Sequence, residues 1–168
     1  MRGCVATQLL AVPDGVALAG RIAEAAFKLH CATEYISTER THTMADELRI
    51  LLDRLMRVAQ QHPAWAARVL AVWAGCETIG ATVVPIVRGI HRDFCSDQII
   101  VDAEHIYLID FDLYCWGDVG VDIGNFNIRV YRMLSLARHI SLSTEMTERQ
   151  HLTERLIAVC ETELCRLR

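Results

Sequence analysis

The stretch "GIHRDFCSDQIIVDAEHIYLIDFDLYCWGD", from Gly89 to Asp118, decides how this chain folds. It contains two short apolar runs, "IIV" and "IYLI", which are separated by the polar turn "DAEH". Short runs of β-branched and aromatic residues on either side of a turn predict a β-hairpin. The aspartates of the stretch lie before, between and after these runs. We therefore expect a hairpin that carries a dense group of carboxylates.

Amphipathic helices are predicted on both sides of this hairpin. Before it, apolar residues recur at helical spacing from Val16 to His30 and again from Leu48 to Val58. Thr43 is the expected N-cap of the second helix, because acidic residues follow in its first turn. Pro63 is expected to open a third helix, since proline suits a first helical turn. Beyond Gly117 the pattern predicts two more helices.

Length and composition favour one cytoplasmic domain. A chain of 168 residues can bury a real core. Its mean hydropathy of +0.23 is high, but no run reaches the roughly 18 apolar residues of a membrane helix. The N-terminus does not resemble a secretory signal. We therefore expect neither export nor contact with a membrane.

Charge and cysteine usage exclude further classes of protein. The net charge is −4 and the basic residues are scattered, which gives no footprint for a nucleic acid. Seven cysteines occur without any C-x-x-C pair, which argues against a disulfide framework and against a zinc site. Free thiols in a reducing compartment are the expectation. Cys95 lacks a base and an orienting partner in the sequence around it, so we do not expect a nucleophile there.

Four polar residues of the central stretch would meet at one mouth of the predicted hairpin. They are Asp93 before the first strand, Gln98 at its start, and Asp110 and Asp112 after the second strand. Hard oxygen ligands of this kind suit Mg²⁺, which takes one or two carboxylates together with waters and substrate phosphates. A separate carboxylate on the loop can accept a hydroxyl proton. This set is the apparatus of phosphoryl transfer.

The same stretch resembles a known family. "IHRDFCSDQIIV" followed by "IYLIDFDLYCWGDVGVDIGNF" is similar to the catalytic loop and metal-binding segment of the aminoglycoside phosphotransferase and choline kinase-like family, a branch of the protein-kinase-like fold. The family pattern is H-x-D-x-x-x-x-N, a hairpin, I-D-[FW]-[DEG] and then G-D-x-x-x-D. The resemblance is closest from His91 to Phe126. The earlier segment "AGRIAEAAFKLH" also resembles the helix that follows the hinge in this family.

The resemblance assigns the reacting groups. It implies that Asp93 is the catalytic base for the substrate hydroxyl and that His91 supports the catalytic loop as a buried imidazole. Gln98 stands where the family usually has a magnesium-binding asparagine, a variant that maltokinase-like members also resemble. Asp110 would be the principal ligand of the Mg²⁺ that bridges the phosphates of ATP. Asp112 would either assist the metal or face solvent.

The resemblance also implies structural roles near this site. Asp118 and Asp122 form the G-D-x-x-x-D pattern, and Asp122 should be buried and tie its helix to the backbone of the catalytic loop. The segment from Asp110 to Asp118 is too short for a regulatory activation loop, so Arg92 is expected to pack the loop or form an ordinary salt bridge. Trp116 would line a substrate pocket or pack the loop, and packing is the preferred interpretation. His30 is expected to act as a C-terminal cap or dipole partner of its helix.

A kinase of this family also needs a β-rich N-terminal lobe with a phosphate-covering loop. No G-x-G-x-x-G pattern occurs in the sequence. We therefore expect residues 1–168 to form a single phosphotransferase C-terminal-lobe domain without that ATP-binding lobe. The chain would be a fragment, a natural half-enzyme or an inactive remnant. An exposed surface for the other lobe predicts self-association or a complementing N-terminal lobe as partner.

The expected fold class is α+β, mainly α-helical, with short β-hairpins at the catalytic loop. The expected function is ATP-dependent transfer of a phosphoryl group to a hydroxyl of a small molecule such as an aminoglycoside, amino-alcohol or sugar. We expect weak turnover or none from this chain alone. Two alternatives stay open: a non-catalytic binding or scaffolding remnant of such a kinase, and a metal-dependent hydrolase.

Overall fold

The computed structural model describes residues 3–10, 15–32, 39–103, 105–126 and 129–167, without the side chains at 15–16, 126–135 and 167. These residues are mostly helical, with two small three-stranded sheets. They group into two compact units. Unit 1 is Met1–His42 with Pro85–Phe126, and unit 2 is Thr43–Val84 with Asn127–Arg168. The single-domain organisation expected from the sequence stays a prediction.

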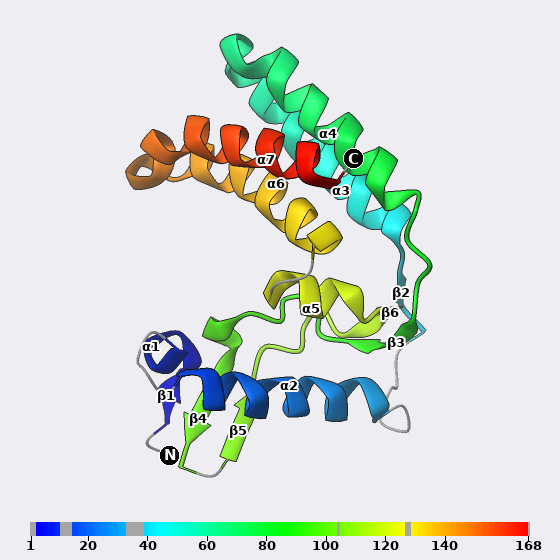
Figure 1. Cartoon of the computed structure of the whole chain (residues 1–168), viewed down its shortest axis with the longest axis vertical. Helices are drawn as coiled ribbons and strands as arrows, with labels where there is room; N and C mark the ends of the chain where they lie inside the picture. Colours follow the sequence, from blue (N-terminus) through cyan, green and yellow to red (C-terminus); the bar gives the residue numbers. More distant parts are fainter. Residues whose placement is uncertain (1–2, 11–14, 33–38, 104, 127–128, 168) are drawn as a thin grey trace. The chain divides into compact units, whose positions relative to one another are not determined.

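The predicted hairpin is confirmed in unit 1. Strand β4 (Ile99–Asp102) pairs antiparallel with β5 (His105–Leu108), and β1 (Cys4–Val5) joins the other edge of β4. Helix α1 (Ala6–Leu10) follows β1 directly, and α2 (Gly15–Cys31) matches the first predicted helix. Figure 1 shows α2 alongside this small sheet.

The core of unit 1 joins α2 to the hairpin. Leu18, Ile22 and Ala26 recur every four residues and so share one face of α2. They pack in one buried cluster with Ile99 of β4 and with Phe94, which precedes the hairpin. The helix therefore fixes the position of the polar segment that contains Phe94.

A second sheet in unit 1 was not predicted. Strand β6 (Cys115–Asp118) lies between β2 (Thr41–His42), which runs parallel to it, and β3 (Val87–Ile90), which runs antiparallel. Gly117 is required in β6, because a Cβ there would lie 2.4 Å from Ile90 Cδ1. The short helix α5 (Gly120–Phe126) follows. The strands of this sheet come from distant parts of the chain, so local periodicity did not reveal it.

Unit 2 is built from four helices: α3 (Met44–Gln61), α4 (Ala66–Gly80), α6 (Arg129–Glu145) and α7 (Thr153–Leu167). The predicted N-cap is confirmed, since Thr43 and Asp46 form a reciprocal capping box at the start of α3. Pro63 opens the 3-10 turn η2 (Pro63–Trp65), and the α-helix proper begins only at Ala66. A second 3-10 segment, η4 (Thr147–Leu152), connects α6 to α7.

Apolar side chains fill the core of this bundle, among them Leu55, Val72, Ile140 and Ile157. All seven cysteines are free thiols, as the sequence predicted. Among the described residues, no helix is long and apolar enough to cross a membrane.

Candidate active site

A buried carboxylate holds the loop between β3 and β4, here called the 91–98 loop. Asp122, in the first turn of α5, is fully buried. Its Oδ2 accepts a hydrogen bond from the backbone N–H of His91 at 2.8 Å, and its Oδ1 accepts one from Arg92 at 2.7 Å. The side-chain amide of Asn125 donates to the carbonyl of Arg92 at 2.9 Å. This placement agrees with the burial and the link expected for Asp122.

A third partner of Asp122 was missed by the sequence analysis. His30, near the end of α2, is buried, and its Nε2 lies 2.9 Å from Asp122 Oδ2. Sequence reasoning placed it as a helix cap or dipole partner. The signal was available, because Ile22, Ala26 and His30 follow each other at four-residue spacing on the buried face of α2. Asp122 therefore connects α2, α5 and the 91–98 loop.

The imidazole of His91 is also fully buried. Its Nε2 lies 2.8 Å from the carbonyl oxygen of Ile109 and donates to it. The ring packs against Phe94 and Phe111, with ring centroids 6.2 and 4.8 Å away. His91 thus joins the loop to the end of β5, as a support would. Its distance from solvent does not suit a proton shuttle.

The hairpin brings Asp93, Gln98 and Asp110 together. The Nε2 of Gln98 lies 3.3 Å from Asp110 Oδ2 and 3.4 Å from Asp93 Oδ2, so one amide donates to two carboxylates. The backbone N–H of Ile109 donates to the carbonyl of Gln98 at 3.1 Å, which extends the pairing of β4 and β5 to this point. Both aspartates are exposed. The three side chains form a mouth that is open to a ligand.

The backbone at Asp110 is unusual. Its φ is 65°, in the left-handed region that few residues other than glycine adopt. Aspartate tolerates this conformation better than most residues do. Strained backbone conformations of this kind are common at functional sites. Asp110 lies two residues beyond the end of β5, and its carboxylate there meets the amide of Gln98.

The other two predicted aspartates have different hydrogen-bond partners. Asp112 is exposed, and its carbonyl oxygen accepts a hydrogen bond from Arg40 Nη1 at 3.4 Å. Among the described residues, its carboxylate forms no hydrogen bond with Asp93, Gln98 or Asp110. Asp118 accepts hydrogen bonds from the backbone N–H of Ile86 and of Gly120, at 3.2 and 3.0 Å. Its carboxylate therefore stabilises the turn from β6 into α5.

The ability of these side chains to hold a metal ion depends on Asp93, Asp110 and the Gln98 amide that lies between them. In the described part of the chain, no group of three or more His, Cys, Asp or Glu side chains is arranged to hold a metal. Mg²⁺ does not need such a group, since one or two carboxylates with waters and phosphates are enough. The Gln98 amide lies between two carboxylates, where a cation would also be favourable. The residues present therefore fit Mg²⁺.

Three residues that neighbour these side chains in sequence are Cys95, Arg92 and Trp116. Burial raises the pKa of the Cys95 thiol, and the charge of Asp93 adds to this, so the thiol is a poor nucleophile. Arg92 is half-buried with a φ of 72° and is held through its backbone. Trp116 lies within β6 and is paired with Gly89 of β3, a position that suits a side chain with a packing role.

Comparison with known protein families identifies the family of this chain. The model of a family described as the phosphotransferase enzyme family matches residues 5–135, more than three quarters of the chain. The match includes the 91–98 loop, the hairpin and Asp122. No curated protein and no solved structure matches this chain.

Proposed function

The chain belongs to the phosphotransferase enzyme family, and from this premise we propose that it is the C-terminal lobe of a kinase-like enzyme. The proposed reaction moves the γ-phosphoryl group of ATP to a hydroxyl group of a small molecule, such as an aminoglycoside, an amino-alcohol or a sugar. The observation that carries this proposal is the convergence of Asp93 and Asp110 on Gln98. Phosphoryl transfer depends mainly on positioning and on neutralising charge, which such a mouth can supply.

Asp93 is the proposed base. Its carboxylate is exposed, and Asp122 holds the backbone of the two residues that precede it. The hydroxyl proton passes to Asp93 as the hydroxyl oxygen bonds to the γ-phosphorus. The bond from that phosphorus to the β,γ-bridging oxygen breaks, and ADP leaves with the electron pair.

Gln98 and Asp110 are the proposed holders of Mg²⁺, with Asp112 close by in sequence to assist through water. Bound Mg²⁺ supplies charge neutralisation at the phosphate oxygens. Rotation of the Gln98 amide about its terminal bond would present Oε1 in place of Nε2, and an oxygen is the ligand that Mg²⁺ prefers.

Binding of Mg·ATP to the purified chain tests this proposal by calorimetry. We expect saturable binding that requires Mg²⁺ and that Asp110→Ala weakens by at least about tenfold, since loss of metal-site groups costs that much. Asp53→Ala, which removes an exposed aspartate of α3, is the matched control and should bind as the parent does. Equal affinities of the parent and Asp110→Ala would contradict the assignment of Asp110.

Asp93→Asn separates the two proposed roles. It should leave Mg·ATP binding within about twofold of the parent, while it lowers kcat wherever turnover is measured, because an amide cannot accept the proton. A binding or scaffolding remnant would instead show no Mg²⁺-dependent binding in any of the variants.

A further inference from the structure

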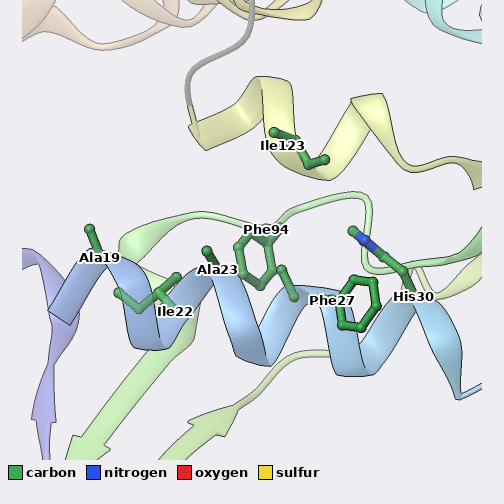
Figure 2. Close-up of a pocket in the computed structure, with 8 residues that line it drawn as sticks. Ala19, Ile22, Ala23, Phe27, His30, Phe94 and Ile123 are labelled. Carbon is green, nitrogen blue, oxygen red and sulfur yellow. The ribbon is translucent and has the colours of Figure 1, made fainter. Parts of the chain in front are cut away.

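A cavity of about 360 Å³ lies in unit 1 between α2, the 91–98 loop and α5. Figure 2 shows side chains from these three elements directed toward the space between them. The volume falls within the range of about 300–1,000 Å³ that is typical of small-molecule sites. The mouth that holds Asp93 and Asp110 is not part of its lining. The cavity is therefore distinct from the proposed phosphotransfer site.

Alanines in α2 create this space. Ala19, Ala23 and Phe27 recur every four residues and form one wall, where the two methyl side chains leave room that larger residues would fill. Ile22 and Phe94 form a closed floor, with exposed fractions of 1% and 2%. This floor belongs to the core of unit 1, so the cavity keeps its shape without a ligand.

The lining is suited to an uncharged molecule. None of its residues is Lys, Arg, Asp or Glu, and the one polar side chain is His30. The Nε2 of His30 is already engaged by Asp122. A charged ligand would lose its hydration without gaining a counter-charge, which is costly.

The rim of the cavity exposes large apolar side chains. Phe27 is 67% exposed and Ile123 is 36% exposed. A bound apolar molecule would shield both side chains from water, which favours binding because apolar surface is buried.

We propose that this cavity binds an uncharged, apolar small molecule of one or two rings. The bound molecule would touch Phe94, which follows Asp93 directly, and His30, which contacts the carboxylate that holds the loop. The site thus lies behind the 91–98 loop and is separate from the nucleotide.

Titration with N-phenyl-1-naphthylamine, a neutral fluorophore, tests this proposal on the full chain. We expect one saturable site, whose affinity Ala23→Phe reduces at least tenfold because the ring fills the cavity. Ala71→Phe is the matched control, since Ala71 is also an exposed alanine within a long helix but lies in α4. It should leave the affinity unchanged.

Hydrogen exchange with and without the fluorophore locates the site. Protection should appear in α2 and in the 91–98 loop. Protection confined to α3 and α4, equal binding by the two phenylalanine variants, or no saturable binding would each overturn the proposal. Binding that weakens as the protein concentration rises would identify a second copy of the chain as the occupant, and would overturn it too.

Discussion

Asp122 accepts three hydrogen bonds with two oxygens, and every donor comes from a segment that shapes the site. A buried carboxylate loses its hydration and is tolerated only where such bonds replace the water. The backbone amides of His91 and Arg92 and the imidazole of His30 replace it here. The position of Asp93 is therefore set by a residue that lies far from it in sequence.

Asp122→Ala should lower the free energy of unfolding by about 3–5 kcal/mol, because it leaves buried donors without an acceptor. Urea titration followed by circular dichroism measures this change. Asp112→Ala removes an exposed aspartate and should change the free energy by no more than about 0.5 kcal/mol. If the two variants were equally stable, Asp122 would not organise the loop.

Among the elements of unit 2, helices α4 and α7 pack closely and carry an ion pair at their edge. A Cβ at Gly75 would lie 2.7 Å from the side chain of Leu164, so glycine permits the close approach. Burial raises the pKa of Cys76 in α4 and of Cys160 in α7 to about 12, which makes both thiols inert. Arg68 donates two hydrogen bonds of 2.8 Å to the carboxylate of Glu161.

This ion pair predicts a pH dependence of stability. The hydrogen bonds from Arg68 hold the pKa of Glu161 below its ordinary value of 4.5. Because the folded pKa is the lower one, the stabilisation is present above about pH 4.5 and is lost as the pH falls through the folded value. Both side chains are more than a third exposed, so we expect about 1 kcal/mol or less.

Glu161→Gln should therefore be less stable than the parent at pH 7, and the difference should shrink toward zero below pH 4. Urea unfolding at a series of pH values measures it. Glu148→Gln, which removes an exposed glutamate of η4, is the control and should follow the parent at each pH. A difference that stayed constant with pH would rule out the role given to Arg68.

At the scale of the whole molecule, each compact unit combines two separate stretches of the chain. Unit 1 exposes several large apolar side chains. Two of them, Phe111 and Leu113, follow Asp110 closely in sequence and are 41% and 44% exposed. Ile86, just before β3, is 59% exposed. Each of these side chains has apolar area that contact with another copy of the chain would remove from water.

We expect the chain to self-associate as its concentration rises, and sedimentation velocity measures this. Ile86→Thr should shift the equilibrium toward the monomer, because it removes apolar area and keeps the β-branch. The backbone hydrogen bonds of Ile86 to Asp118 and Val119 do not depend on its side chain. A parent that stays monomeric at the highest concentration would contradict this expectation.

The local sequence determined much of this protein. The helical periodicity of the sequence predicted α2 and α3, and the apolar runs with the turn between them predicted the β4–β5 hairpin. These predictions succeeded because both patterns depend on neighbours only a few residues apart. The positions of Asp93, Gln98, Asp110 and Asp112 predicted that all four would meet, and hydrogen bonds join the first three of them. The catalytic and metal-binding roles of these residues stay predictions.

Only the tertiary structure decided the rest. The sheet of β2, β6 and β3, the division into two interleaved units, the His30–Asp122 contact and the apolar cavity all join segments separated by dozens of residues. No local pattern specifies such contacts, since they form only when the buried faces of distant elements meet. The left-handed backbone at Asp110 was not predicted either, because the position holds an aspartate and not a glycine.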